Sequence, residues 1–575
     1  MDSSFSSSFH PGIPPKLRLL FRLTDSDNWP EHPHGAATST PAAELGPTTT
    51  SLHLHLRLPS PQQSPAIVHF NHEQTSPSLP SHPRHSTNMA ASKKYAVDFL
   101  SFVNASPTPF HAVESAKQRL LKAGFSEIKE RDPWASTVKK GGRYFLTRNG
   151  SSIVAFGVGK KWKPGNGMAL LGAHTDSPAL RIKPISRKFG ENGSYIQVGV
   201  ETYGGGLWHT WFDRDLSIAG RAMVRGEGGQ IVSKLIKVDS PILRIPTLAI
   251  HLDRQENFQF NKETQLFPIA GLATAELNKN PKGEEKPEGE SETTEGEFKP
   301  LAAITERHHA PIVERIAKEA GVEVKDIIDF EIILYDTQLS VLGGLNDEFI
   351  YSARLDNLMM SYCATEGIIE SLSSETALDD EPGIRLISLF DHEEIGSQTA
   401  QGADSNLLPA VIRRLSVLPA EGSSPAPPST SAYEETLIKS MLWSCDQAHA
   451  VHPNYGAKYE SSHRPEMNKG PVIKVNANAR YATNSPGIVM TQEVAQKAGV
   501  PLQLFVVRND SSCGSTIGPM LSAALGARTV DMGNAQLSMH SIRETGGSHD
   551  VEHAVKLFKS YFEHYSALEP TITVD

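Results

Sequence analysis

The stretch "IRLISLFDHEEIGS", residues 384–397, decides the fold because a largely apolar run ends abruptly in four titratable side chains. The run Ile384–Phe390 is short, continuous and rich in branched residues, which predicts a strand buried on both faces. It leads directly into Asp391, His392, Glu393 and Glu394. Two adjacent glutamates repel one another and are costly to remove from water. A buried strand that ends on them therefore marks a candidate functional site.

Other apolar runs end in the same kind of side chain. The run "MALLGAHTD" (168–176) reaches His174 and Asp176, "SMLWSCD" (440–446), a strand or a helix, reaches Asp446, and "ARTVDMGNAQLSMH" (527–540) reaches His540. Asp356 lies in "YSARLDNLMM", where a loop enters a predicted helix. In an open α/β sheet, ligands gather at the carboxyl ends of the strands. Several carboxylates and two histidines meeting there favour a pair of divalent metal ions.

The spacing of His174 and Asp176 has a mechanical reason. Side chains two residues apart on a strand share a face, so Asp176 can accept the second imidazole N–H of His174 and set its tautomer. Taken alone, "HTD" is a weak signal, because histidine and aspartate often end a strand at a turn. The combination with the acids at 356, 393, 394 and 446 and with His540 is what favours a metal site.

Length and composition limit the classes of function. A chain of 575 residues predicts more than one domain. No apolar run approaches the ~18 residues of a membrane span, and the net charge of −10 argues against a nucleic-acid binder. Three widely spaced cysteines, Cys363, Cys445 and Cys513, indicate neither a disulfide scaffold nor a cysteine zinc site. We expect a reducing compartment, the cytoplasm.

Residues 1–88 differ from the rest of the chain. They hold 13 of the 39 prolines and 9 of the 23 histidines, with no sustained hydrophobic period. Such a segment cannot bury enough apolar surface to order itself, so we expect a disordered extension. The alternative is a transit peptide to a plastid or another organelle. Six acidic residues against five Lys or Arg argue against that alternative.

The remaining chain predicts an α/β catalytic domain interrupted by an insert. Residues 89–186 and 334–575 alternate helix and strand patterns, including a hairpin that turns at Asn149–Gly150. Residues 187–333 read as a β-rich inserted domain, with a charged, mobile loop at 278–300. Inside the insert, "YGGGLW" (203–208) lacks a phosphate-loop pattern and is expected to form tight β-turns. His308 and His309 are expected to be exposed, and Cys445 is expected to be a packing residue.

The sequence resembles the aspartyl aminopeptidases, a family of co-catalytic zinc metalloaminopeptidases specific for N-terminal Asp or Glu. The resemblance runs from about Ala90 to Asp575. The motifs that carry it are "LLGAHTDSPALRIKP", "ETYGGGLWHTWFDRDL", "SARLDNL", "DHEEIGS", "AHAVHPNY", "KGPVIKVNANARYATN", "VRNDSSCGSTIGP" and "MGNAQLSMHSIRE". It implies a mixed β-sheet zinc-peptidase domain flanked by helices, with an inserted β-rich dimerisation domain.

The resemblance also implies a role for each matching residue. The implied ligands of two zinc ions are His174, Asp356 as the bridge, Glu394, Asp446 and His540. The implied catalytic residues are Glu393, as general base, and Asp176, which orients His174. The implied substrate-binding residues are His251, Glu393, His449, Lys474, Tyr481 and His540. His251 would reach the site of a neighbouring subunit in a homo-oligomer, a tetrahedral dodecamer built from dimers.

The chemistry of these residues suits removal of an N-terminal Asp or Glu from a peptide. Two metal ions lower the pKa of a bound water, Glu393 moves its proton to the leaving amine, and His449 stabilises the oxyanion. Lys474 supplies a fixed positive charge for the acidic side chain of the substrate. The alternative is a non-catalytic scaffold or cargo particle of the same fold, and such a particle has no need of Glu393.

Overall fold

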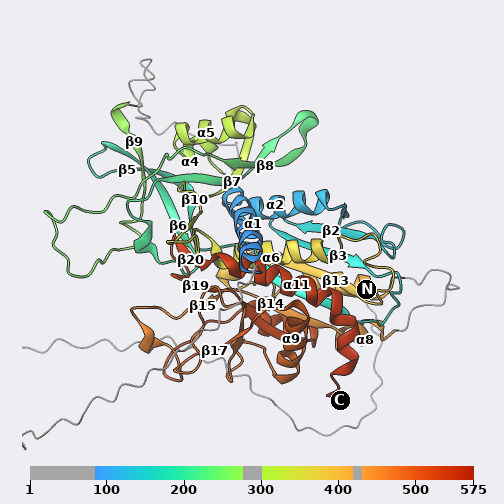
Figure 1. The fold of residues 1–575 in the computed structure, drawn as a ribbon. Helices are drawn as coiled ribbons and strands as arrows, with labels where there is room; N and C mark the ends of the chain where they lie inside the picture. The colour runs from blue at the N-terminus through green and yellow to red at the C-terminus, as the bar shows by residue number, and fades with distance from the viewer. Residues whose placement is uncertain (1–83, 276–300, 419–429, 575) are drawn as a thin grey trace, which may run out of the picture. The chain divides into compact units, whose positions relative to one another are not determined.

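The structure, a computed structural model, describes residues 84–275, 301–418 and 430–574, with side chains from residue 93 onward. Figure 1 shows helices around a twisted sheet and a second group of strands, drawn in green, beside it. The predicted extension at 1–88, up to residue 83, and the predicted loop at 278–300 lie outside the described residues. Among the described helices, none combines the length and the apolar character that crossing a membrane requires.

The largest sheet in the described part of the chain has nine strands and carries the predicted site. Its strands, in order across the sheet, are β1 (Ser126–Glu127), β2 (Arg143–Arg148), β3 (Ser152–Val158), β13 (Ile384–Phe390), β4 (Met168–His174), β14 (Met441–Cys445), β18 (Arg528–Gly533), β16 (Val472–Val475) and β17 (Gln503–Val506). The four central strands β13, β4, β14 and β18 run parallel to one another, whereas β3 and β16 on either side of them are antiparallel. The predicted hairpin joins β2 to β3, and both Asn149 and Gly150 have positive φ angles, of 56° and 68°.

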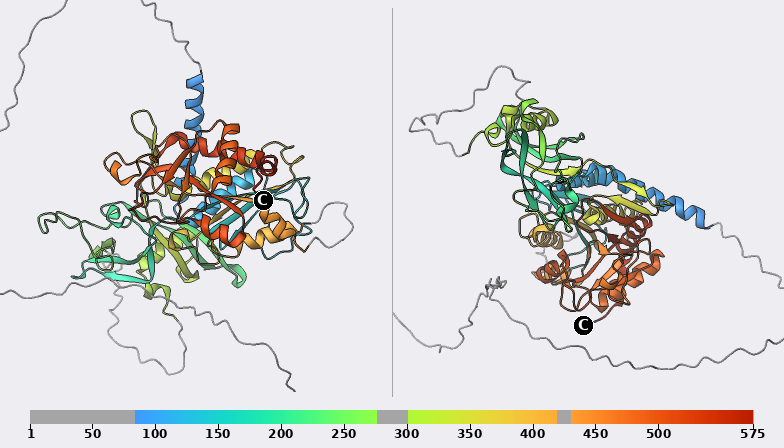
Figure 2. Two further views of the ribbon diagram at one scale, coloured as in Figure 1. Left: turned by 90° about the horizontal axis from the view of Figure 1, so that it is seen from below. Right: turned by 90° about the vertical axis from the view of Figure 1, so that its left-hand side faces the viewer.

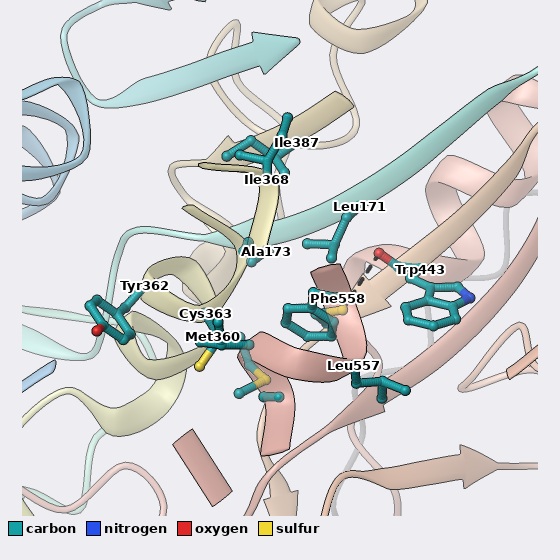
Figure 3. Packing of buried hydrophobic residues seen from close by; sticks show 14 of the residues in the cluster. Leu171, Ala173, Met360, Tyr362, Cys363, Ile368, Ile387, Trp443, Leu557 and Phe558 are labelled. Atoms are coloured by element: carbon teal, nitrogen blue, oxygen red, sulfur yellow. Dashed lines mark hydrogen bonds between the residues drawn. The ribbon is translucent and has the colours of Figure 1, made fainter. Parts of the chain in front are cut away.

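The central strands are buried on both faces, which explains their continuous apolar sequence. Along β4, Leu171 and Ala173 face one hydrophobic cluster, while Met168 and Leu170 face the other. Figure 3 shows Leu171 and Ala173 beside side chains of the helices on the first face, including Phe558. The short run ending at Asp446 is also a strand, β14, and the burial of Cys445 confirms it as a packing residue.

Helices cover both faces of this sheet (Figure 2). The first face packs against α1 (Arg84–Ala105), α2 (Pro109–Lys122), α6 (Leu355–Ser371), α9 (Ser485–Ala498) and α11 (Ser548–Leu568). The second face packs against α7 (Leu407–Ser416), α8 (Ala432–Ile438) and α10 (Ile517–Leu525). A mixed sheet with a parallel centre, enclosed by two helical layers, is the predicted α/β fold.

The inserted β-rich segment forms a second, six-stranded sheet among the described residues. Its strands in order are β8 (Ile231–Lys237), β7 (Leu216–Arg225), β10 (Ile327–Asp336), β5 (Ala179–Phe189), β6 (Tyr195–Tyr203) and β9 (Ile269–Leu272). Helices α4 (Ile304–Arg307) and α5 (Ala310–Ala320) lie against this sheet. The domain boundaries drawn from the sequence remain a prediction.

The expectation that His308 and His309 are exposed is wrong. Both are buried, His308 with its Nδ1 2.8 Å from Ser186 Oγ and His309 with its Nε2 2.8 Å from the carbonyl oxygen of Lys188. Burial lowers the pKa of His308 to about 4, so its ring is neutral. Two adjacent histidines before a polar helix resemble surface residues in the sequence, but here they join α4 and α5 to strand β5.

A small third sheet brings the last segments of the chain toward the site. Its strands in order are β11 (Val341–Gly343), β12 (Phe349–Ser352), β20 (Glu544–Gly547), β19 (Ala535–Leu537) and β15 (Ala448–His449). Strand β12 leads into Asp356 at the start of α6, and the turn between β19 and β20 carries His540. This sheet therefore sets two side chains of the candidate site near the ends of the large sheet.

Candidate metal centre

Two neighbouring parallel strands deliver the first part of the site. His174 ends β4 opposite Phe390, which ends β13, and the backbone N–H of Thr175 donates to the carbonyl of Phe390 at 2.7 Å. Beyond β13 the chain turns through His392, whose φ is 64°, into a short 3-10 turn that starts at Glu393. This left-handed residue breaks the strand alternation, so the two glutamates leave the sheet edge in different directions.

The other side chains arrive from three further segments. Asp446 follows β14, the neighbour of β4 on its other side, and its N–H donates to the carbonyl of Met532 at 2.8 Å. Asp356 lies in the first turn of α6 with non-helical backbone angles, and His540 has a φ of 67° in the turn after β19. His174, the glutamate pair and Asp446 thus lie at the carboxyl ends of parallel strands, as the rule for open sheets predicts. Asp356 and His540 join them from segments that follow strands of the small third sheet.

The carboxylate of Asp356 lies between two histidines. Its Oδ1 is 3.3 Å from His174 Nε2 and its Oδ2 is 3.5 Å from His540 Nε2. On the His174 side, Asp446 Oδ1 is 3.5 Å from the same Nε2. On the His540 side, Glu394 Oε2 is 3.4 Å from His540 Nε2. One bridging carboxylate flanked by two histidine–carboxylate pairs is an arrangement for two adjacent cations.

The residues present fit a pair of divalent metal ions. Potential ligand atoms within 4.8 Å of one another occur in two groups, His174 with Glu393 and Asp446, and His174 with Asp356 and Glu394. Among the described residues, the buried oxygens Asp356 Oδ1, Glu394 Oε1 and Asp446 Oδ1 have no hydrogen-bond partner. A buried carboxylate oxygen without a partner is costly. Nitrogen and oxygen donors of this kind are the ligands that zinc takes in catalytic sites.

The protein groups alone make the site strongly negative. Burial opposes a charge on His174, but the carboxylates of Glu393, Asp176, Asp356 and Asp446 outweigh burial and raise the pKa of that imidazole. Burial, together with the charge of Asp356, raises the pKa of Glu394 well above its ordinary value. The same excess of negative charge that attracts protons here is what attracts metal cations.

Glu393 lies at the edge of this cluster: its carboxylate is grouped with His174 and Asp446, but it does not lie between the two histidines as Asp356 does. Its Oε2 is 3.8 Å from His174 Nε2, and its side chain keeps 16% of its exposure, compared with 4% for Glu394. Burial raises the pKa of Glu393 to about 8; the charge of His174 opposes this shift, and Asp446 adds to it. A carboxyl group with a raised pKa, reachable by solvent at the edge of the cluster, is suited to accept and return a proton.

A family model described as aminopeptidase I zinc metalloprotease (M18) matches residues 102–562. The aspartyl aminopeptidase of Aspergillus oryzae is 69% identical over 492 residues, which cover 84% of this chain and 98% of that protein. The chain belongs to the M18 family of zinc aminopeptidases. Members of this family are zinc metalloaminopeptidases. The histidine and carboxylate groups of this chain fit the same metal.

Further M18 relatives agree in sequence and in structure. Aspartyl aminopeptidase 4 of Saccharomyces cerevisiae is 54% identical over 487 residues, covering 84% of this chain and 96% of that protein. The cryo-EM structure of an Ape4 and Nbr1 complex matches with a TM-score of 0.76 and 48% identity, covering 86% of this chain and 89% of that one. The S. cerevisiae mApe1 dodecamer matches with a TM-score of 0.71 and 30% identity, covering 84% of this chain and 99% of that one.

Of three further predicted substrate-binding residues of this M18 chain, Lys474 contacts the metal-site cluster directly. Lys474 on β16 is 3% exposed, and its Nζ lies 3.3 Å from Asp446 Oδ2 and 5.5 Å from the ring centroid of Tyr481. His449 on β15 is exposed, and its ring packs edge-on against Phe505. Partial withdrawal from water, with the charge of Lys474, lowers the pKa of His449 and favours its neutral form.

His251 is the predicted residue that the single subunit does not bring to the cluster. It lies in an exposed loop of the inserted segment, where it makes no hydrogen bond or ion pair with another described residue. Its neighbours Leu248, Ile250 and Leu252 are 59%, 67% and 76% exposed. A row of exposed aliphatic side chains is typical of a surface that another protein covers.

Asp176 holds more of the site than its predicted role of orienting His174. His174 Nδ1 lies 3.1 Å from the backbone carbonyl of Asp176 and 3.3 Å from its Oδ1. Since a carbonyl oxygen only accepts, Nδ1 carries the proton and Nε2 is left for the cluster. The carboxylate of Asp176 also accepts the backbone N–H groups of Glu393 and Glu394, each at 3.1 Å.

Sequence reasoning missed Glu544, a buried carboxylate behind the cluster. Its Oε2 accepts the N–H of Asp356 at 3.1 Å, and its Oε1 accepts the N–H of His540 at 2.9 Å. Gln536 donates to Oε1 at 3.2 Å. The Glu544 side chain thus holds the backbone of both Asp356 and His540, two predicted metal ligands that are far apart in the sequence. The only local signal was an acid four residues after His540 in "HSIRE", which is compatible with a surface turn.

Proposed function

We propose that the chain removes unblocked N-terminal Asp or Glu residues from peptides, with Glu393 as general base beside two zinc ions. The observation that carries this proposal is the position of Lys474, a buried cation next to a cluster of carboxylates and histidines. Zinc at the cluster accounts for peptide hydrolysis, and the lysine accounts for an acidic substrate side chain. The names of the relatives support the same activity.

The metal donors in this proposal are His174 and Asp446 at one position, Glu394 and His540 at the other, and Asp356 between them. Bound zinc would supply Lewis acidity at this position, the property that polarises a carbonyl and lowers the pKa of water from 15.7 to about 7. Asp176 holds His174 in the tautomer that presents Nε2 to the cluster. The chain contributes fixed donors that do not have to reorganise during the reaction.

The remaining steps belong to residues of the chain. Glu393 accepts the proton of the attacking water and returns it to the leaving amine, because its carboxylate lies at the edge of the cluster. His449, at the exposed rim, donates a hydrogen bond to the developing oxyanion. Lys474 pairs with the acidic side chain of the first substrate residue, and the ring of Tyr481 lies beside the lysine ammonium.

Release of p-nitroaniline from an Asp-anilide tests this function. We expect hydrolysis of the Asp substrate to exceed that of a Leu-anilide, and to fall to background after chelation because the donors no longer hold zinc. Activity should return on addition of Zn²⁺, and apo-protein dialysed against Ca²⁺ alone serves as the control. Hydrolysis that persists in protein shown by elemental analysis to be metal-free would contradict the proposal.

A non-catalytic particle of the same fold is the weaker alternative. Such a particle has no physical need for buried carboxylate oxygens without partners, which cost stability unless a cation pairs with them. It also has no use for a base at position 393. We propose the cytoplasm as the location, which agrees with the three free cysteines.

We further propose that the chain assembles into a tetrahedral dodecamer built from dimers, in which His251 enters the site of the partner subunit. The dodecameric state of the mApe1 relative supports assembly. The exposed row Leu248, Ile250 and Leu252 around His251 supports a subunit contact in the inserted segment. In a two-fold dimer the contact is reciprocal, so each subunit donates one histidine and receives one.

Co-expression of two inactive variants tests this exchange. His251→Ala lacks the donated residue, and Glu393→Gln lacks the base, so neither homo-oligomer is expected to be active. In a mixed dimer the His251→Ala subunit keeps Glu393 and receives His251 from its partner. Random pairing therefore restores roughly one quarter of wild-type activity. Activity measured across size-exclusion fractions should follow the assembled oligomer. A co-expressed sample no more active than the two separate variants would contradict donation across subunits.

A further inference from the structure

The turn between β6 and the short 3-10 helix Trp208–Trp211 contacts both halves of the candidate metal centre. This turn, residues 203–207, belongs to the inserted segment, and the sequence predicted only tight β-turns for it. The structure places it against the large sheet, where it touches Asp176, Glu394 and His540. Each of these contacts acts on a different part of the site.

Tyr203 contacts the part of the site around His174 through the carboxylate of Asp176. Its hydroxyl donates to Asp176 Oδ2 at 2.7 Å. That same oxygen accepts the N–H of Glu394, while the other oxygen accepts the N–H of Glu393 and lies 3.3 Å from His174 Nδ1. A single phenol therefore fixes the rotation of a carboxylate that holds one predicted ligand and the backbone of the glutamate pair.

Gly204 allows the turn to approach Glu394 at close range. Its φ is +74°, and a Cβ atom built on it would lie 3.1 Å from Glu394 Cβ and 3.3 Å from the Glu394 carbonyl oxygen. An L side chain is strained at this φ, and here it would also press on a predicted ligand. The glycine is required both by the backbone conformation and by the close contact.

Gly205 and Leu207 form hydrogen bonds with His540 through their backbone groups. The carbonyl of Gly205 lies 3.0 Å from His540 Nδ1, and the N–H of Leu207 donates to the carbonyl of His540 at 2.9 Å. A carbonyl oxygen only accepts, so Nδ1 carries the proton and Nε2 faces Asp356 and Glu394. Thr210 adds a third link, because its Oγ1 accepts the N–H of Ile542 at 3.0 Å.

We propose that the turn Tyr203–Leu207 of the inserted segment is a positioning element for both zinc sites, acting through Asp176, Glu394 and His540. Tyr203 sets the carboxylate that orients His174, and Gly205 sets the tautomer of His540. Residues that orient the ligands of a metal in this way commonly change its affinity about 10–100-fold when replaced. The inserted segment is then part of the metal centre within its own subunit, in addition to any role in assembly.

Tyr203→Phe tests this proposal because it removes one hydroxyl and keeps the ring. Tyr335→Phe is the matched control, since Tyr335 is a buried tyrosine of the same sheet whose hydroxyl donates to the carbonyl of Val238 at 2.7 Å. Apo-protein of the full chain is titrated with Co²⁺, and the visible absorption band reports both affinity and ligand geometry. We expect Tyr203→Phe to bind Co²⁺ ~10-fold or more weakly with an altered band. Tyr335→Phe should match wild type.

A pair of glycine variants provides a second test that leaves hydrogen bonds unchanged. Gly204→Ala presses on Glu394, whereas Gly228→Ala meets nothing within 4 Å at a similar φ of +76°. Both carry the same backbone strain, so only Gly204→Ala is expected to weaken Co²⁺ binding. Thermal unfolding of the apo-proteins and size-exclusion chromatography establish that each variant folds and assembles.

The outcomes separate this inference from the proposed function on which it rests. If wild type binds no Co²⁺ at the cluster, the two-metal function itself is wrong. If wild type binds two ions and Tyr203→Phe binds them within twofold of the same affinity with an unchanged band, the positioning role is wrong. An equal loss in Tyr335→Phe would also overturn it, because the effect would then come from the stability of the sheet.

Discussion

Glu393→Gln is expected to lower kcat about 10²–10⁴-fold while both zinc ions and KM are retained. Glutamine keeps the size of the side chain and removes the group that accepts the proton of water. We expect the zinc ions to stay because Glu393 lies at the edge of the cluster, with its Oε2 3.8 Å from His174 Nε2, and because the proposed donors are five other side chains. Steady-state kinetics with an Asp-anilide and elemental analysis of the same sample measure the two quantities.

Glu394→Gln is the contrasting variant for this experiment. Glu394 is the neighbouring residue, but its carboxylate faces His540 at 3.4 Å and one of its oxygens is buried without a partner. We expect this variant to lose zinc as well as activity, because an amide is a poorer ligand than a carboxylate. If Glu393→Gln lost zinc as readily as Glu394→Gln, the division of the pair into a base and a ligand would be wrong.

Lys474→Met is expected to abolish the preference for acidic substrates. Methionine keeps most of the volume and apolar stem of lysine but carries no charge, so an Asp side chain would enter the pocket without a partner. Leaving a buried charge unpaired costs about 3–5 kcal/mol, which corresponds to a fall of roughly 10²–10⁴-fold in kcat/KM for the Asp substrate. Hydrolysis of a Leu-anilide should change little or rise, and the ratio of the two rates is the measurement.

Two controls accompany the lysine variant. Lys439→Met removes an exposed lysine that donates to the carbonyl of Gly165, and it should leave the Asp-to-Leu ratio unchanged. Zinc content must be measured because Lys474 also lies 3.3 Å from Asp446, a predicted ligand. If a fully zinc-loaded Lys474→Met enzyme still hydrolysed the Asp substrate faster than the Leu substrate, another group would be the one that binds the acidic side chain.

The sequence predicted those parts of the site that follow directly from buried strands. The runs ending at His174, at Glu393–Glu394 and at Asp446 were recognisable because an apolar segment that stops on acids or histidine is unusual. Even so, the run before Asp446 was compatible with a helix. Only its pairing with β4 and β18 makes it a strand. The five residues of this run contain no local pattern that predicts such long-range pairing.

The missed contacts are those made between distant segments. Tyr203 ends a strand and is followed by glycines, a pattern that ordinary hairpins share, and Glu544 lies in a polar stretch. Their importance comes from partners at Asp176, Asp356 and His540 that the local sequence does not identify. The error at His308–His309 has the same origin, since burial there depends on strand β5, more than a hundred residues earlier.

The position of β13 in the large sheet has a consequence for synthesis of the chain. Strand β13 lies between β3 and β4, yet residues 175–383 separate it from β4 in the sequence. Until β13 leaves the ribosome, β4 has neither of its neighbours, because β14 follows later still. At 5–20 residues per second this interval lasts roughly 10 to 40 s. During it, an apolar strand with two unpaired edges is open to wrong partners, and the inserted domain can already fold. The nascent chain is therefore expected to need chaperone protection between the emergence of β4 and that of β13.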